Sequence, residues 1–330
     1  MVSKPLLQVN KLQTAFNSDG GVIRALDGVS FSVAPGQTLA VVGESGCGKS
    51  VTAMSIMGLV QETNGFIESG EILFQGKDLA KISRDEIRKI RGNDIAMIFQ
   101  EPMTALNPVF TIGNQISEVF TIHKNMSKAE ARAASLRMLE MVSIPDPKKR
   151  LDEYPFQLSG GMRQRVVIAM ALACEPDLLI ADEPTTALDV TIQAQILKLM
   201  KNLQKEKQTS IIFITHDLGV VAEVADYVVV MYAGKAVEYG SVEEVYANPR
   251  HPYTKGLMRS VPTLEIDKSE KLFTIEGTVP GLKNLPVGCR FNTRCQLAGE
   301  KCFEAPPPLE NVGNQNHQVA CYKLEETTNR

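Results

Sequence analysis

The chain has 330 residues, of which 44% are hydrophobic and 22% are charged, an ordinary composition for a soluble globular protein. Its net charge of -3 gives no basic field that would favour a nucleic-acid partner. No apolar run approaches the roughly 18 residues that a membrane-spanning helix needs, and the first residues lack the apolar core of a signal peptide. We therefore expect a cytosolic protein with one large and one smaller domain.

The first eighty residues predict mainly strands. Residues 6–33 predict antiparallel strands, because apolar residues alternate with serines over 29–33. The apolar run 38–42 predicts a short buried strand, and residues 50–59 predict a helix. A further strand is expected at 71–74.

The stretch between that buried strand and that helix reads GESGCGKS and fits the phosphate-binding P-loop, G-x-x-x-x-G-K-[ST]. Its glycines let backbone N–H groups approach phosphate oxygens closely, and the helix N-terminus adds partial positive charge. Lys49 can reach the outer phosphates, and the Ser50 hydroxyl can bind Mg2+. The predicted ATP-binding residues here are Gly43, Glu44, Ser45, Gly46, Cys47, Gly48, Lys49, Ser50 and Val51.

Residues 101–172 change character and predict a mainly helical block. The pair Ser127 and Glu130 fits a capping box, which marks a helix N-terminus. In the helix that follows, apolar residues recur at helical spacing and are expected to form its buried face. These residues are Ala133, Leu136 and Leu139.

Two continuous apolar runs, 178–182 and 211–216, suit central strands of a parallel sheet that is covered on both faces. Ligands of such sheets lie beyond the carboxyl ends of the strands. Asp182 is expected there as a magnesium ligand, Glu183 as the base that polarises the attacking water, and His216 as a hydrogen-bond partner of the γ-phosphate. The catalytic candidates are Glu183, His216 and Gln100, and the magnesium ligands are Ser50, Gln100 and Asp182.

The string LSGGMRQR at 158–165 is the most specific in the chain. Ser159 can cap the following helix, and the two glycines leave the first N–H groups of that helix bare. The N-terminus of this helix is therefore a second anion-binding helix end, in addition to that of the P-loop helix. A single triphosphate bound in one pocket does not require two such ends. We therefore expect a head-to-tail pair of subunits, in which this end contacts the nucleotide of the other subunit. The residues expected to act in trans are Ser159, Gly160, Gly161 and Met162.

Over residues 6–250 the chain resembles the ATP-binding cassette (ABC) ATPases. Residues 43–50 resemble Walker A, 178–183 resemble Walker B with its glutamate, and 158–162 resemble the signature LSGGQ with Met162 in place of glutamine. The resemblance implies a P-loop NTPase of the α/β class, with a RecA-like core, an antiparallel β-subdomain and a helical subdomain at about 101–175. By resemblance, Gln100 is the Q-loop, Asp189 is in the D-loop, His216 is the H-loop and Phe16 stacks on adenine.

Three segments are similar to the ATP-binding subunits of oligopeptide, dipeptide and nickel importers: 100–108, 251–254 and 279–302. The match is closest to the D-type subunit of bacterial peptide importers. It implies an ATPase that powers peptide uptake from the cytoplasmic side of the inner membrane, with a second ABC ATPase, two permeases and an extracytoplasmic binding protein. An importer of nickel or another small solute, and a soluble ABC ATPase without a transport role, are the alternatives. The transported solute stays open.

We expect an ATP-binding domain at 1–260 and a loop-rich extension at 261–330, which holds four of the six cysteines. These four lack the short C-x₂₋₄-C spacing of structural zinc sites, and four thiolates suit a [4Fe–4S] cluster. The D-type subunits carry a similar tail, and some hold such a cluster. Zinc, or cysteines without metal, are the alternatives. The four residues are Cys289, Cys295, Cys302 and Cys321.

Overall fold

A computed structural model describes residues 4–100, 105–186, 189–261, 273–313 and 317–324. The chain divides into two compact units of discontinuous sequence. Among the described residues, no helix is long and apolar enough to cross a membrane. Unit 1 consists mainly of residues 34–37 and 81–214, and unit 2 of residues 5–33, 38–80 and those from 215 onward.

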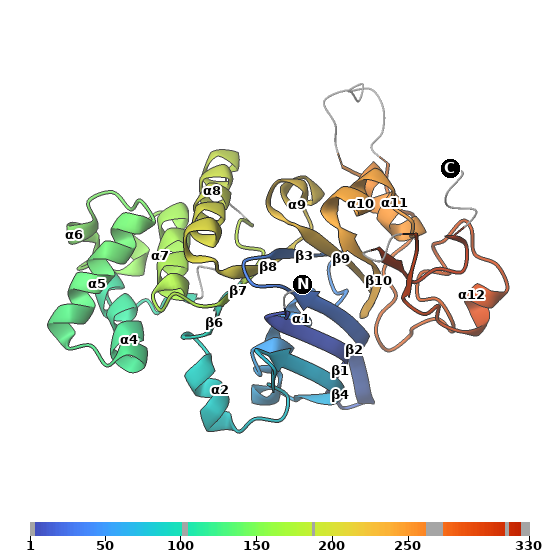
Figure 1. The fold of residues 1–330 in the computed structure, drawn as a ribbon, viewed down its shortest axis with the longest axis horizontal. Helices are drawn as coiled ribbons and strands as arrows, with labels where there is room; N and C mark the ends of the chain where they lie inside the picture. The colour runs from blue at the N-terminus through green and yellow to red at the C-terminus, as the bar shows by residue number, and fades with distance from the viewer. Residues whose placement is uncertain (1–3, 101–104, 187–188, 262–272, 314–316, 325–330) are drawn as a thin grey trace. The chain divides into compact units, whose positions relative to one another are not determined.

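Unit 2 contains an antiparallel sheet with the strand order β2-β1-β4-β5, of which three strands are labelled side by side in Figure 1. The pairing of β1 with β2 runs from Leu7 opposite Val33 to Ser18 opposite Gly21. This confirms the antiparallel strands predicted for 6–33. The strands are β1 (Leu7–Ser18), β2 (Gly21–Val33), β4 (Gly65–Phe74) and β5 (Lys77–Asp78).

The second sheet portion of unit 2 has the order β11-β12-β10-β9-β3. β3 runs parallel to β9, and β9 and β10 form an antiparallel hairpin that turns at Ala233 and Gly234. Gly234 has a φ of 83°, which is favourable only for glycine. The strands are β3 (Thr38–Val42), β9 (Tyr227–Tyr232), β10 (Lys235–Ser241), β11 (Glu310–Asn311) and β12 (Gln318–Val319).

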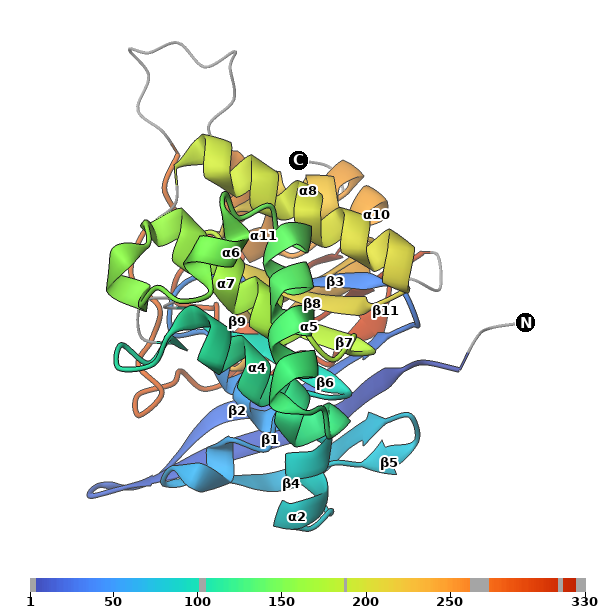
Figure 2. The same cartoon turned by 90° about the vertical axis from the view of Figure 1, so that its left-hand side faces the viewer.

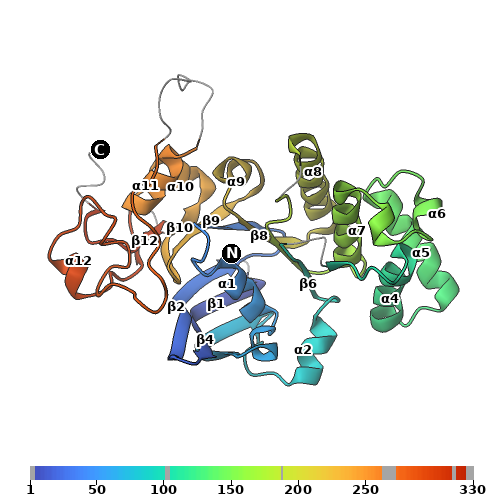
Figure 3. The ribbon, with the colours of Figure 1, turned by 180° about the vertical axis from the view of Figure 1, so that it is seen from behind.

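The C-terminal residues of unit 2 belong to its core. β12 pairs with β10 through Val319 opposite Glu238, and Figure 3 shows this red segment beside β10 and α11. Phe291 packs edge-on against Tyr232, with ring centroids 5.1 Å apart, and Tyr253 lies 4.7 Å from Tyr232. The helices of unit 2 are α1 (Lys49–Ile56), α9 (Leu218–Val224), α10 (Val242–Ala247), α11 (Pro252–Arg259), α12 (Lys301–Glu304) and the short 3₁₀ helix Val60–Glu62.

Unit 1 contains three parallel strands in the order β8-β7-β6. Every residue of β7 and β8 is buried, which confirms the central parallel strands predicted from the two apolar runs. The strands are β6 (Ile95–Ile98), β7 (Leu178–Asp182) and β8 (Ser210–Thr215).

The predicted helical block is present, and Figure 2 shows its helices α4, α5 and α7 in green. The helices of unit 1 are α2 (Arg84–Ile90), α4 (Ile112–Lys124), α5 (Lys128–Met141), α6 (Pro147–Arg150), α7 (Gly160–Leu172), α8 (Val190–Lys207) and the short 3₁₀ helix Pro155–Gln157.

The capping box of Ser127 and Glu130 opens α5 as predicted. The predicted buried face of this helix was correct only in part, because Leu139 is buried but Ala133 is exposed and Leu136 is only half-buried. Small residues let α5 approach α4, and the hydroxyls of Ser135 and Ser117 lie 2.8 Å apart. Hydrophobicity alone does not select such positions. The buried residues of α5 are Ala131, Ala134, Ser135 and Leu139.

Candidate functional site

The P-loop of unit 2 begins where the buried strand β3 ends. A Cβ atom on Gly43, whose φ is 150°, would lie 2.2 Å from the carbonyl oxygen of Met231. Gly48 precedes α1 with a φ of 105°, and a Cβ atom there would lie 2.7 Å from the side chain of Leu26. Only glycine fits at these two positions, so the backbone of the loop packs directly on its neighbours.

Lys49 is the first residue of α1, and its side chain turns back over the loop. Its Nζ donates hydrogen bonds to the carbonyl oxygens of Gly43 at 2.7 Å and Glu44 at 3.2 Å. Ser45 and Gly46 are exposed at the tip of the loop, and Ser50 is half-buried. The tip of the P-loop is therefore exposed to solvent, and the ammonium group of Lys49 lies within the same short segment.

Cys47 is fully buried within the P-loop. Burial raises the pKa of its thiol, although Lys49 acts in the opposite direction. The thiol is therefore neutral at physiological pH and packs as a small apolar side chain.

Glu44 is bound by residues that lie far away in the sequence. Its backbone N–H donates to the hydroxyl of Tyr253 at 2.8 Å. Its carboxylate accepts two hydrogen bonds from the guanidinium of Arg294, at 2.7 and 3.1 Å. Burial opposes the charge of Arg294, but hydrogen bonds with Glu44 and Tyr232 raise its pKa above the ordinary value. Neither partner of Glu44 was predicted from the sequence, which carries no local signal for contacts of this range.

Phe16, the expected adenine-stacking residue, lies on β1 between Ile23 of β2 and Gly65 of β4. A Cβ atom on Gly65 would lie 2.7 Å from the ring of Phe16, so the ring packs directly over that glycine. The side chain is half-buried, which leaves part of its ring accessible.

His216 follows β8 and belongs to unit 2, and its side chain is exposed. The next residue, Asp217, caps α9 by accepting from the N–H groups of Gly219 at 2.9 Å and Val220 at 3.3 Å. The hydroxyl of Thr215 accepts from the N–H of Asp217 at 3.0 Å. Hydrogen bonds on both sides therefore order the backbone that carries His216.

In unit 1, Asp182 is the last residue of β7 and is buried. Glu183 follows in the left-handed backbone region with a φ of 47°, a conformation that costs a non-glycine residue about 1–3 kcal/mol and is concentrated at functional sites. Its carboxylate accepts hydrogen bonds from Gln100 at 3.1 Å and Thr186 at 3.0 Å. The structure thus brings Gln100 and Glu183 together at the ends of neighbouring strands.

The helix end of the signature string is open to solvent. Ser159 caps α7 by accepting from the N–H of Met162 at 3.4 Å, and both Ser159 and Gly160 are exposed. A Cβ atom on Gly160 would meet no atom within 4 Å, whereas one on Gly161 would lie 3.1 Å from Ile192 of α8.

Two further residues of unit 1 support this region. Gln164 lies in the string 158–165 but was given no role from the sequence, and its buried amide donates at 2.6 Å to the carbonyl of Pro184, which follows Glu183. Asp189 caps α8 by accepting from the N–H of Ile192 at 2.9 Å. Residues 187–188 of the D-loop and 101–104 of the importer-like string lie outside the described residues.

The four C-terminal cysteines are free thiols that line one cavity, together with His251 and Phe291 among others. Burial raises the pKa of Cys289, Cys295 and Cys321, that of Cys321 to about 11. Among the described residues, no three Cys, His, Asp or Glu side chains are grouped so that they could hold a metal ion. The structure therefore gives no support to the predicted cluster or to zinc.

The importer-like string at 251–254 has a structural role. His251 caps α11, and its Nδ1 accepts from the N–H of Tyr253 at 3.1 Å. Burial lowers the pKa of His251 to about 4, so its ring is neutral. The fully buried carboxylate of Glu238 accepts from the N–H groups of Arg250 and His251 and contacts the ring of His317 at 2.7 Å. This string therefore fixes the start of α11, which positions the Tyr253 hydroxyl on the P-loop.

Comparison with known protein families gives two matches. A family model for ABC transporters matches residues 26–186, and a model for the C-terminal region of oligopeptide and dipeptide transporters matches residues 237–302. The dipeptide transport ATP-binding protein DppD of Bacillus subtilis is 54% identical over 97% of this chain and 95% of that protein. The oligopeptide transport ATP-binding protein OppD of the same organism is 55% identical over 97% of this chain and 89% of that protein.

Among solved structures, a dimeric post-hydrolysis state of the ATP-binding cassette MJ0796, bound to ADP and phosphate, is similar with a TM-score of 0.65. It is 27% identical and covers 72% of this chain and 98% of that cassette. The fold is therefore that of an ABC ATPase, a P-loop NTPase of the α/β class, as the motifs predicted.

Proposed function

Because the chain belongs to the ABC transporter family, among the ATP-binding proteins with an oligopeptide and dipeptide transporter C-terminal region, we propose that it hydrolyses ATP to power peptide import. The observation that carries this proposal is full-length similarity to DppD and OppD, which extends through the C-terminal region. These relatives favour dipeptides or oligopeptides over nickel as the transported solute.

The P-loop is the proposed site of the ATP phosphates. Its glycine-lined backbone, the helix end of α1 and the ammonium group of Lys49 all favour bound anions. Phe16 offers a partly accessible ring for adenine. Mg2+ would be held by Ser50, Gln100 and Asp182, whose oxygen atoms suit a hard cation; the magnesium ion supplies charge neutralisation on the phosphates when it is bound.

Glu183 is the proposed general base for the attacking water. Its hydrogen bonds with Gln100 and Thr186 orient the carboxylate, and its left-handed backbone conformation is typical of a functional position. The exposed His216 would donate a hydrogen bond to the γ-phosphate.

The signature end of α7 is proposed to bind the nucleotide of a second ABC ATPase subunit. Its support is the exposure of Ser159 and Gly160 at a capped helix N-terminus. The similar cassette MJ0796 was solved as a dimer with ADP and phosphate. Gly161, Met162 and Asp189 would lie at the same interface.

The remaining partners follow from the peptide-importer assignment. We propose two permeases and an extracytoplasmic binding protein, with this chain on the cytoplasmic side of the inner membrane. Residues 1–260 would form the ATP-binding domain and 261–330 the extension, and the helical block would dock the permeases.

A [4Fe–4S] cluster in the extension is proposed on the donor set alone. Four free thiols line one cavity, and each thiolate of such a cluster binds a different iron, so the set need not close around one ion. Anaerobic purification followed by iron, sulfide and zinc analysis tests this. Broad visible absorbance with four irons per chain supports a cluster, whereas stoichiometric zinc or metal-free protein rejects it.

Isolation of the native complex tests the proposed function. The chain, tagged in its own cell and extracted with a mild detergent, should bring down two membrane permeases and a second ABC ATPase. Recovery with ribosomal or scaffold proteins instead would overturn the transport role.

A further inference from the structure

We infer that Arg294 is a positioning residue of the ATP site, which holds the P-loop through Glu44. The inference rests on the proposal that the P-loop binds ATP. It adds a residue from the C-terminal extension, 250 positions away in sequence, to the machinery of that site.

The guanidinium of Arg294 is itself held in place. Besides its two hydrogen bonds with Glu44, it donates to the hydroxyl of Tyr232 at 3.3 Å and to the carbonyls of Ile275 at 3.1 Å and Glu276 at 2.9 Å. Its side chain is only 3% exposed. A bidentate guanidinium–carboxylate pair fixes both distance and plane, so the position of Arg294 determines that of the Glu44 carboxylate.

The same segment fixes the backbone of the loop. Phe291, three residues before Arg294, packs against the rings of Tyr232 and Tyr253. The Tyr253 hydroxyl accepts from the N–H of Glu44. The backbone of Glu44 is therefore bound to the aromatic cluster of Tyr232, Tyr253 and Phe291, and its side chain is bound to Arg294.

Glu44 lies next to the groups that hold Lys49. The ammonium group of Lys49 donates to the carbonyls of Gly43 and Glu44, so a displacement of Glu44 moves both acceptors. The contacts thus run from Arg294 through Glu44 to the lysine that reaches the phosphates. This is why we assign Arg294 a positioning role and not only a contribution to stability.

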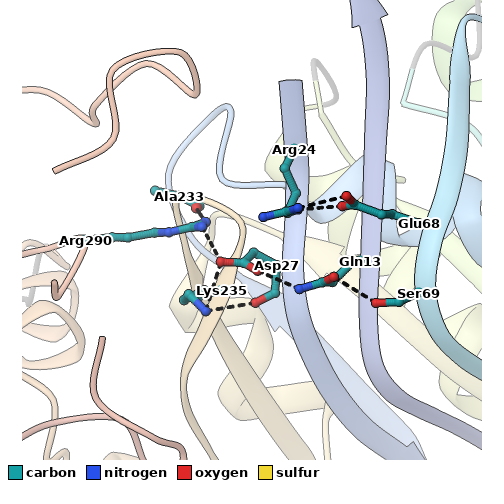
Figure 4. A network of polar contacts seen from close by, with 8 residues as sticks. All are labelled: Gln13, Arg24, Asp27, Glu68, Ser69, Ala233, Lys235 and Arg290. Carbon is teal, nitrogen blue, oxygen red and sulfur yellow. Dashed lines mark hydrogen bonds and ion pairs between the residues drawn. The ribbon is translucent and has the colours of Figure 1, made fainter. Parts of the chain in front are cut away.

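A second arginine of the extension contacts the β9–β10 turn, which is itself hydrogen-bonded to the P-loop. Figure 4 shows Arg290 beside the carbonyl of Ala233 and the carboxylate of Asp27, where Lys235 also binds. The next residue in that turn, Gly234, donates its N–H to the carbonyl of Cys47 at 2.8 Å. The extension therefore contacts the P-loop directly through Arg294 and indirectly, through the β9–β10 turn, by Arg290.

The test is the affinity of the purified full chain for Mg-ATP, measured by isothermal titration calorimetry. Arg294→Met should weaken binding about tenfold, which corresponds to ~1.4 kcal/mol. Glu44→Gln and Tyr253→Phe should weaken it in the same direction. The double variant Arg294→Met with Glu44→Gln should be no weaker than either single variant, because both remove the same pair. Arg294→Lys keeps the positive charge but cannot form the bidentate pair, so its affinity for Mg-ATP should lie between those of the wild type and Arg294→Met.

Arg24→Met is the matched control. Arg24 makes a bidentate pair with Glu68 at 2.6 and 2.8 Å in the same unit, also drawn in Figure 4, but that pair does not touch the P-loop. The affinity of the Arg24→Met variant for Mg-ATP should equal that of the wild type.

The free energy of unfolding without nucleotide separates positioning from stability. Unchanged ATP affinity in Arg294→Met and Glu44→Gln overturns the inference, whether or not stability falls. If Arg294→Met does not fold, Glu44→Gln decides alone, since Glu44 is partly exposed. Lys49→Ala separates the failure of the proposed ATP site from the failure of the positioning role. Normal ATP binding by Lys49→Ala rejects the proposed ATP site. Loss of ATP binding by Lys49→Ala together with normal ATP binding by Arg294→Met rejects only the positioning role of Arg294.

Discussion

The guanidinium of Arg294 binds the carboxylate of Glu44 through two hydrogen bonds, although 250 residues separate them in sequence. One partner lies in the C-terminal extension and the other in the phosphate-binding loop. The extension is therefore part of the unit that carries the P-loop and not a separate appendage to it.

The aromatic cluster of Tyr232, Tyr253 and Phe291 should carry much of the stability of that unit. Phe291 is 3% exposed, and Phe291→Ala should lower the free energy of unfolding by about 3–5 kcal/mol. Denaturant unfolding checks this value. Phe303 lies in the same extension but is 51% exposed, so Phe303→Ala should change stability by less than about 0.5 kcal/mol. Equal losses in both variants would contradict the packing of the extension described above.

Glu183→Gln should retain ATP binding while steady-state hydrolysis by the complex falls by about 10²–10⁴-fold, because the amide cannot accept a proton from water. Glu175→Gln, which alters an exposed glutamate paired with Lys207, is the control and should hydrolyse ATP normally. Near-normal hydrolysis in Glu183→Gln would remove Glu183 from the role of general base.

Gly160→Val tests the signature end of α7. A Cβ atom at Gly160 meets no atom within 4 Å, so the variant should fold and bind ATP as a single subunit. Its bulk should block the approach of a neighbouring subunit's phosphate and reduce hydrolysis by the assembled pair more than about tenfold. Wild-type hydrolysis in the assembled pair would argue against a role in trans.

Cys47 should resist alkylation in the folded chain. It is fully buried, and burial raises the pKa of its thiol, so the reactive thiolate is scarce. Mass spectrometry after treatment with N-ethylmaleimide should find Cys47 unmodified in the native chain and modified after denaturation. Rapid native modification would show that the P-loop opens to solvent.

The strands could be predicted from the sequence because their pattern is local. Continuous apolar runs predicted β7 and β8, and alternation predicted the β1–β2 pairing. The N-termini of two helices could also be predicted from the sequence, since Ser127 and Ser159 cap α5 and α7 as expected. The buried face of α5 was predicted correctly at Leu139 but not at Ala133 or Leu136, because small residues and a serine pair form its contact with α4.

Residues of the candidate site could be predicted from the sequence only where they belong to a recognisable motif. Gln100 and Glu183 were both named as catalytic candidates, and they are hydrogen-bonded to each other. Arg294, Tyr253 and Gln164 support the site through contacts between distant segments, and no periodicity or spacing in the sequence encodes such contacts. The cysteine spacing likewise predicted a donor set but not its geometry.

ATP-driven uptake of a labelled dipeptide or oligopeptide by the reconstituted complex tests the proposed function most directly. Proteoliposomes that contain the native complex with ATP on the side of this chain should accumulate peptide from the side of the binding protein. Complexes with Glu183→Gln should bind ATP and accumulate none. Uptake that is equal with Glu183→Gln, or that needs no ATP, would contradict the conclusion that ATP hydrolysis by this chain drives peptide import.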